Sequence, residues 1–320
     1  MDRRQFLMMG GLVTAGVALS GTTAFAEWRP RRPINLIVPY KAGGGTDSFG
    51  RAVAAVAEKA LPVPVVIVNK PGSSGITGAT EASRSRPDGS TMMLTSTGSF
   101  LLTSMLRDTD VTPLDSFRIV AQVGKLTTSL VVPANSPFQT VADLVDHATA
   151  NPGSLRWAHT GRGGFHHVAG QGFLDSNGLE TVDVPFKGGS ATRAAVIGGQ
   201  VDFGFMGIQQ TAGFEKEMRA LALNDDKRDA FKTEVPTFEE LGFQWVPVTS
   251  PIVVFAPKDT PDDVVEGMQE AVRRMTELPE FAEAMAQRGN APAFKTGADA
   301  EALIRDMKTS AEPIIAALKQ

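Results

Sequence analysis

Cysteine is absent from the 320 residues of this chain. Disulfide bridges, thiolate metal sites and catalytic cysteines are therefore excluded. Histidine is scarce as well, with four in the chain, so metal or acid–base chemistry has few places to reside. Net charge is small, because 35 acidic residues stand against 31 basic ones. This balance gives no sign of a nucleic-acid partner or of an anionic membrane surface.

Long apolar runs are missing too, apart from a short one at the N-terminus. The pair Arg3-Arg4 precedes an apolar stretch over 6–19, and a small-residue cleavage pattern ends at Ala26. This stretch is shorter than the roughly 20 residues that a membrane span needs. Residues 1–26 are therefore expected to be an export signal. The paired arginines are typical of the twin-arginine route, with an ordinary secretion signal as the alternative. The mature chain is expected to be a periplasmic monomer without a cofactor.

Short apolar runs alternate with amphipathic segments through most of the mature chain. The runs are INLIVP, VPVVIVN, TMMLTS, RIVAQV, SLVVPA, LRWAHT, VDVPF, VDFGFMG, RALALN and SPIVVFAP. Such alternation predicts an α/β protein with largely parallel sheets. Thr140 and Asp143 are spaced as a capping box, and Thr260-Pro261 has the pattern of a helix cap followed by its first residue. Pro313 should kink or interrupt the last helix.

Two segments, SLVVPANSPFQT and SPIVVFAPKDTP, resemble each other. Each has an extended apolar run, then a turn that contains proline, then a capped helix. Paired segments so far apart in the chain suit two strands that cross between two lobes. We therefore expect residues 27–127 and 252–320 to form lobe 1, and residues 128–251, inserted between them, to form lobe 2.

Three consecutive glycines follow the first apolar run, in INLIVPYKAGGGTDSFGR over 34–51. Glycines between a strand and a helix let the backbone approach a ligand, and the first amides of the helix favour an anion. In open α/β sheets, ligands bind beyond the carboxyl ends of the strands, where this loop should lie. The loop matches neither G-x-x-x-x-G-K-[ST] nor G-x-G-x-x-G, so a nucleotide site is disfavoured. A small carboxylate or a phosphate stays open.

A second glycine loop, in WAHTGRGGFHHVAG over 157–170, repeats this order of strand, turn and helix. Arg162 adds a charge that cannot be removed by titration. Two such loops in two lobes predict a ligand held between them and sensed by hinge closure. The alternative for either loop alone is a tight turn that contacts nothing.

Catalytic and metal sites find little support. His166 and His167 would point about 100° apart on a helix, so they cannot readily share a metal, and one should cap or pack while the other faces the cleft or solvent. No G-x-S-x-G elbow is present. Asp47 could serve as a general base, but its place at a helix start favours an N-cap. We assign no catalytic residue and no metal ligand.

Six motifs together resemble the periplasmic solute receptors of tripartite tricarboxylate transporters, the Bug family. In order they are INLIVPYKAGGGTD, VNKPGSSG, PDGSTMML, HTGRGGFHHVA, VPFKGGSATRAAVIGGQVDFGF and RALAL followed by VPTFEELGF. The resemblance runs from about residue 34 to about residue 257, with a weaker tail. It implies a two-lobed type II periplasmic binding protein fold, or Venus flytrap. A small carboxylate would sit in the interdomain cleft, held by backbone amides and bridging waters, for delivery to membrane permease subunits.

The resemblance, carried over by position, assigns ligand contacts to both lobes. In the first lobe they are Tyr40, Lys41, Gly43, Gly44, Gly45, Thr46, Asp47, Ser74, Thr97 and Gly98. In the second lobe they are Thr160, Gly161, Arg162, Gly163, Gly164, His167, Phe186, Lys187, Gly188 and Met206. The chain departs from the family at His159 and Gly164, where members commonly have serine. Lys41 and Arg162 are additional cations, which would either meet a second acidic group on the ligand or face solvent.

The expected function is therefore the capture of a mono- or dicarboxylate for a transporter. Two alternatives stay open from the sequence. One is an exported hydrolase or lyase that uses Asp47 or His167, and the other is a carboxylate sensor that docks on a membrane kinase.

Overall fold

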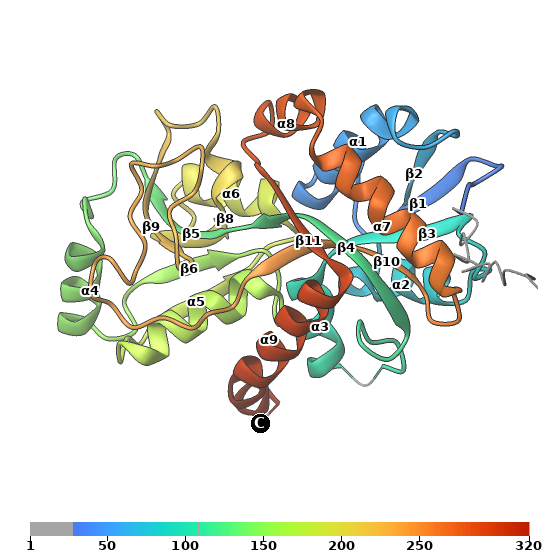
Figure 1. The fold of residues 1–320 in the computed structure, drawn as a ribbon. Helices are drawn as coiled ribbons and strands as arrows, with labels where there is room; N and C mark the ends of the chain where they lie inside the picture. The colour runs from blue at the N-terminus through green and yellow to red at the C-terminus, as the bar shows by residue number, and fades with distance from the viewer. Residues whose placement is uncertain (1–27, 108, 320) are drawn as a thin grey trace, which may run out of the picture.

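The computed structural model describes residues 28–107 and 109–319. Two lobes lie side by side, each built around its own β-sheet (Figure 1). The first lobe holds a six-stranded sheet of order β11-β4-β10-β3-β1-β2, and the second holds a five-stranded sheet of order β7-β6-β8-β5-β9. The predicted two-lobed α/β architecture is confirmed. Within the described ranges no helix is both long and apolar enough to cross a membrane, and the predicted export signal lies outside them.

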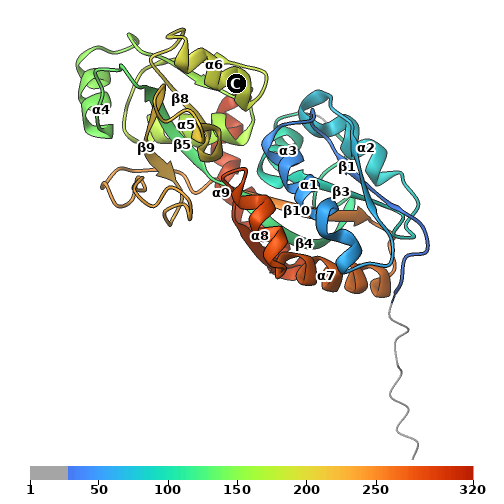
Figure 2. The same cartoon turned by 90° about the horizontal axis from the view of Figure 1, so that it is seen from above.

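The first lobe is built from both ends of the described chain. Its N-terminal part comprises β1 (Ile34–Val38), α1 (Gly45–Val56), β2 (Val65–Asn69), α2 (Ile76–Ser83), β3 (Thr91–Ser96), α3 (Thr97–Leu106) and β4 (Phe117–Leu126). Its C-terminal part comprises β10 (Ser250–Pro257), α7 (Asp262–Thr276), α8 (Pro279–Ala286), β11 (Pro292–Thr296) and α9 (Gly297–Leu318). Helix α9 packs against α3 and also contacts α5 of the second lobe, so it lies where the lobes meet (Figure 2).

The second lobe is formed by the chain between β4 and β10. Its elements are β5 (Thr128–Pro133), α4 (Val141–Ala150), β6 (Arg156–His159), α5 (Phe165–Ser176), β7 (Val182–Pro185), α6 (Gly189–Ile197), β8 (Phe203–Gly207), a 3-10 helix (Ile208–Thr211) and β9 (Met218–Asn224). The segment that follows β9 lies along its edge, since the amide of Leu223 donates to the carbonyl of Pro236.

Apart from β11, which has no counterpart in the second sheet, the two sheets share one topology. In each sheet, three parallel strands are followed by an antiparallel strand that enters the sheet directly after the chain has crossed from the other lobe. Strand β10 runs antiparallel between β3 and β4, and β5 runs antiparallel between β8 and β9. The register pairs Leu126 with Ser250 and Thr128 with Asn224. The carboxyl ends of the parallel strands in both sheets therefore lie at the junction, where α/β sheets bind ligands.

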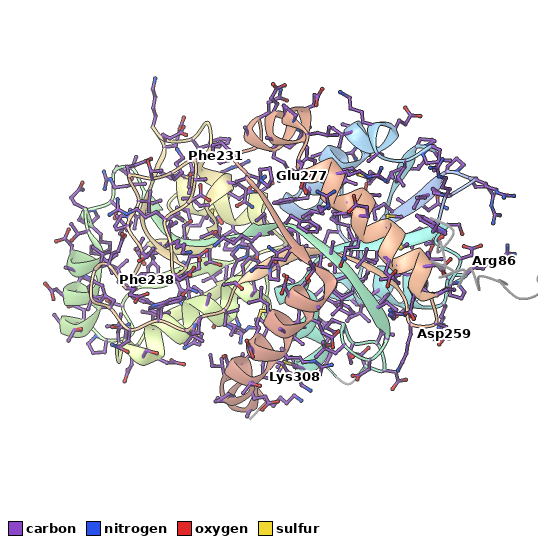
Figure 3. The ribbon with its side chains drawn as sticks, viewed as in Figure 1. Arg86, Phe231, Phe238, Asp259, Glu277 and Lys308 are labelled. Carbon is purple, nitrogen blue, oxygen red and sulfur yellow. The ribbon has the colours of Figure 1, made fainter. Side chains whose placement is uncertain are left out.

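Each lobe has its own aromatic core. In the first lobe, the rings of Phe100, Phe117 and Phe255 pack edge to face. In the second lobe, Phe238 is fully buried and stacks on Phe173 with 4.2 Å between ring centroids (Figure 3). Burial of each large apolar side chain contributes about 1.5–3 kcal/mol. Cores of this kind hold together a chain that has no disulfide.

The helix ends agree with the sequence in one place and differ in another. The hydroxyl of Thr140 accepts a hydrogen bond from the amide of Asp143, whose carboxylate accepts from the amide of Thr140, so the capping box is confirmed. Thr260 was expected to cap α7, but the N-cap is Pro261, whose ψ of 152° already has the extended value of a cap. The Thr260 hydroxyl is buried and has no hydrogen-bond partner within residues 28–107 and 109–319.

Pro313 does not interrupt α9, which continues through it. Proline removes one intrahelical hydrogen bond, but Ala311 and Ile315 on either side are buried in the core of the first lobe. Their packing holds the helix together across the missing bond. The predicted interruption is therefore wrong.

Gly124 of β4 lies beneath α1. A Cβ at this position would overlap the ring of Phe49, which is fully buried. We predict that Gly124→Ala lowers the free energy of unfolding by about 1–3 kcal/mol, because an overpacked core must shift. Urea denaturation measures this loss. In a Phe49→Leu background the same substitution should remove less stability, and fully additive losses would contradict the overlap as the cause.

Candidate functional site

The first glycine loop connects β1 to α1. Gly43 has a positive φ of 81°, and Gly44 is the N-cap of α1 without any side-chain cap. Within the described ranges, the amides of Gly44, Gly45 and Thr46 have no hydrogen-bond partner. This helix end therefore presents unpaired N–H groups together with the positive end of the helix dipole. Its chemistry suits an anion of the size of a carboxylate.

Asp47 holds this loop in place but is not the N-cap that the sequence predicts. Its side chain is 1% exposed, and its carboxylate accepts hydrogen bonds from the amide of Gly43 (2.8 Å), from Arg51 Nε (2.7 Å) and from Asn69 Nδ2 (2.9 Å). Asn69 also donates to the carbonyl of Tyr40 (3.1 Å). Burial acts to raise the pKa of Asp47, but the hydrogen bonds from Arg51, Gly43 and Asn69 outweigh it and lower the pKa. The carboxylate is thus ionised and fully engaged within the loop.

Other predicted contacts of the first lobe lie near this helix end. The Tyr40 hydroxyl accepts a hydrogen bond from Thr95 (3.4 Å), and burial raises its pKa. Ser74 is exposed with a positive φ of 54°. Thr97 is the first residue of α3, and its buried hydroxyl has no hydrogen-bond partner among the described residues. Lys41 is exposed, and no ion pair forms on it within the described ranges.

The second glycine loop, between β6 and α5, differs from the first because its own structure uses its amides. The amide of Gly161 donates to His159 Nδ1 and that of Gly163 to His167 Nδ1, both at 3.2 Å. The amide of Gly164 donates to the carbonyl of Gly161. These three amides, expected to bind the ligand, are therefore already hydrogen-bonded.

A cluster of His159, His167, Asp183 and Arg162 lies behind this loop. Asp183 Oδ2 is 3.2 Å from His159 Nε2 and 4.0 Å from His167 Nε2, while Asp183 Oδ1 is 2.9 Å from Arg162 Nη2. Because each Nδ1 accepts an amide hydrogen, each neutral ring carries its proton on Nε2, facing Asp183. Burial lowers the pKa of His159, and it lowers that of His167 to about 4. Sequence reasoning missed Asp183, since no local motif marks it.

Three side chains of this cluster are close enough together to be considered as metal ligands. One atom each from His159, His167 and Asp183 lie within 4.8 Å of one another. A metal on both Nε2 atoms would move the protons to Nδ1, where they would face the amide hydrogens of Gly161 and Gly163. Metal-bound histidines instead donate from the free nitrogen to an acceptor. The hydrogen-bond pattern thus disfavours a metal.

His166 is buried as well, which corrects the expectation that one of the paired histidines faces the cleft or solvent. His166 and His167 are 7% and 2% exposed. His166 Nδ1 lies 2.8 Å from the Thr160 hydroxyl, whereas its Nε2 has no hydrogen-bond partner in the part of the chain that the structure describes. Burial lowers the pKa of His166 to about 3, so the ring is neutral. The Thr160 hydroxyl is therefore occupied within its own lobe.

The remaining predicted ligand contacts of the second lobe differ in how exposed they are. Phe186 is half-buried and Lys187 is exposed. Gly188 has a positive φ of 91° and is the N-cap of α6. Met206 is fully buried in a hydrophobic cluster of the second lobe, so its side chain belongs to the core.

Helix α3 of the first lobe touches the second loop at both of its ends. A Cβ on Gly98, in its first turn, would lie 3.2 Å from Cβ of Phe165, the first residue of α5. At the other end, a Cβ on Gly163 would overlap the side chain of Leu106. Gly163 also has a φ of 71°, which disfavours other residues. The second glycine loop therefore lies at the junction of the lobes, in contact with α3 of the first lobe.

The neutral histidines predict a pH dependence of stability. In the unfolded chain His167 has its ordinary pKa of about 6.5, whereas burial lowers it to about 4 in the fold. The unfolded state then binds more protons below pH 6.5, so the free energy of unfolding falls as the pH drops from about 6.5 to about 4. His167 alone would contribute roughly 3 kcal/mol of this fall. Urea denaturation across this range should give a shallower fall for His167→Asn, and an unchanged profile would contradict the assignment.

Comparison with known sequences gives one consistent family. A family model described as "Tripartite tricarboxylate transporter family receptor" matches residues 49–319. The match includes the C-terminal helices, where the sequence resemblance is weaker. The "UPF0065 protein in gbd 5'region" of Cupriavidus necator is 31% identical over 296 residues, which cover 90% of this chain and 89% of that protein.

Comparison with solved structures leads to the same family. The periplasmic binding protein BugD superposes with a TM-score of 0.76 at 27% identity, over 90% of this chain and 97% of its own. The structure of R. palustris Rpa4515 with adipate superposes with a TM-score of 0.82, over 90% of this chain and 97% of its own. Its sequence is 24% identical, so this likeness supports the fold alone. The family model thus describes a transporter receptor, and BugD is a periplasmic binding protein, not an enzyme. The chain therefore belongs to the receptor family of the tripartite tricarboxylate transporters.

Proposed function

We propose that this receptor captures a small organic mono- or dicarboxylate in the periplasm and delivers it to the permease subunits of a tripartite tricarboxylate transporter. The observation that carries the proposal is the first turn of α1, whose unpartnered amides follow β1 at the junction of the lobes. A carboxylate can accept several such N–H bonds at once, and bonds to a charged acceptor are the stronger ones. We take residues 27–127 and 252–320 as lobe 1 and residues 128–251 as lobe 2.

The route to the periplasm would be residues 1–26, which lie outside the described ranges and which we propose are an export signal. The receptor would act there as a monomer. Its two lobes would close on one ligand, so a single chain would supply the whole site.

The hinge of this closure would be the crossing from β4 to β5. Lys125 Nζ at the end of β4 lies 2.6 Å from Oδ2 of Asp225, which follows β9. The same oxygen accepts a hydrogen bond from Thr127 in the crossing itself (3.0 Å). This buried carboxylate ties the crossing from β4 to β5 to the end of β9 in the second lobe. The lobes would then rotate about a shared pivot when the ligand binds.

A second acidic group on the ligand would have a limited choice of cations. Arg162 is paired with Asp183, which makes it a weaker candidate than the sequence suggests. Lys41 is exposed beside the first glycine loop, and Lys187 is exposed at the start of α6. Lys41 is therefore the favoured partner of a dicarboxylate.

Neither residue considered for catalysis is free for it. The carboxylate of Asp47 is ionised and holds three hydrogen bonds, and the Nδ1 of His167 is occupied by an amide. A general base needs a free site within reach of the proton that it removes. The site suits binding without turnover.

A thermal-shift screen over organic acids tests the proposed ligand class. A carboxylate present at about 100 times its dissociation constant should add about 2.7 kcal/mol to the free energy of unfolding. Neutral sugars and cationic amino acids serve as controls and should leave the melting temperature unchanged. A flat response to every acid, or a response only to the controls, would exclude the proposal.

Gly44→Leu tests the location of the site. A Cβ at Gly44 would meet only the carbonyl oxygen of Lys41, at 3.5 Å, and the φ of −81° suits any residue. The melting temperature should therefore stay close to that of the wild type. The added side chain would stand beside the unpartnered amides, and affinity for the acid found in the screen should fall by about tenfold or more. Isothermal titration measures the loss, and wild-type affinity in a folded variant would place the anion elsewhere.

A further inference from the structure

Gln209 extends from the second lobe to the first turn of α1. It lies in the 3-10 helix that follows β8. A Cβ on Gly45, in the first lobe, would lie 2.9 Å from Gln209 Nε2. A Cβ on Gly207, in the second lobe, would lie 2.5 Å from the same nitrogen. The carboxamide of Gln209 thus lies between two glycine backbones, one from each lobe.

The carboxamide of Gln209 has no hydrogen-bond partner among the described residues, although it is partly buried. It offers two donors and one acceptor, and leaving such groups unpaired in a partly dry site is unfavourable. The neighbouring Gln210 differs, because its Oε1 accepts a hydrogen bond from Arg193 (3.1 Å). The unpaired carboxamide therefore lies beside Gly45, whose amide also has no partner within the described ranges.

The position of Gln209 is fixed by its surroundings. The amide of Ile208 donates to the carbonyl of Thr127 in the crossing between the lobes (2.9 Å). On another side, a Cβ on Gly289 would lie 3.6 Å from Cα and Cβ of Gln209. The backbone of Gln209 is thus held between the hinge and the loop after α8. Its side chain is left facing the end of α1.

We propose that Gln209 is a ligand-binding residue of the second lobe: its Nε2 donates to the carboxylate that the first-turn amides of α1 bind. The inference rests on the proposed function, because it specifies which groups hold the same anion. It also accounts for the second glycine loop, whose amides at Gly161, Gly163 and Gly164 are already hydrogen-bonded. The second lobe would then contribute to the carboxylate site through the Gln209 side chain, close to the pivot and beside the end of α1.

The experiment compares wild type with Gln209→Met and Gln209→Glu by isothermal titration against malate, succinate, glutarate and adipate. Methionine keeps the volume of the side chain but removes both donors, so affinity for the acids bound by the wild type should fall about 10- to 100-fold. Glutamate places its own carboxylate on the amides of α1. It should abolish binding and raise the melting temperature of the ligand-free protein. Gln200→Ala, on an exposed turn after α6, is the matched control and should bind as the wild type does.

The outcomes separate the two proposals. If the wild type binds one of the acids and both Gln209 variants bind it equally well, the role of Gln209 is overturned while the proposed function stands. If the folded wild type binds none of the four acids and its melting temperature rises with no acid of the wider thermal-shift screen, the proposed function and the role of Gln209 are both overturned. A loss in Gln209→Met without a change of melting temperature supports a contact with the ligand and not a loss of fold.

Discussion

The binding geometry of the first lobe depends on one buried carboxylate. Asp47 joins the glycine loop, helix α1 and strand β2 through its bonds to Gly43, Arg51 and Asn69. Glycine makes the loop conformation accessible, but it also makes many other conformations accessible. The charged acceptor selects one of them, because an unpaired carboxylate inside the fold would be strongly unfavourable. The amides of the first turn are therefore fixed in place before any ligand arrives, which reduces the entropy lost on binding.

A second carboxylate organises the other loop, but indirectly. Asp183 faces the protons on Nε2 of His159 and His167, and their Nδ1 atoms then accept the loop amides. In the first lobe the acid occupies one amide and leaves the helix end open, whereas in the second lobe the histidines occupy the amides themselves. Two loops of similar sequence thus have different chemistry. The first can bind an anion with its backbone, and the second has to use side chains.

The sequence was sufficient for features that depend on neighbouring residues. The alternation of strands and helices, the two glycine loops and the capping box at Thr140 all follow from local pattern. The role of Asp47 was misjudged, because its partner Asn69 lies on the next strand and a sequence does not show which strands are adjacent. Asp183 was missed for the same reason. The sequence could not show that the amides of the second loop are already hydrogen-bonded, because the fold determines which acceptors lie near them.

The exchange of strands between the lobes limits how the protein can move. Strand β10 lies between β3 and β4, so the first sheet is completed by a strand that follows the second lobe in the sequence. Both crossings are hydrogen-bonded to strands of the sheets that they enter, and neither sheet can slide without breaking its register. A relative motion of the lobes must therefore be a rotation about the crossings. Residues near that pivot, Gln209 among them, move little in such a rotation. A donor placed there stays beside α1 while the outer parts of the lobes open and close.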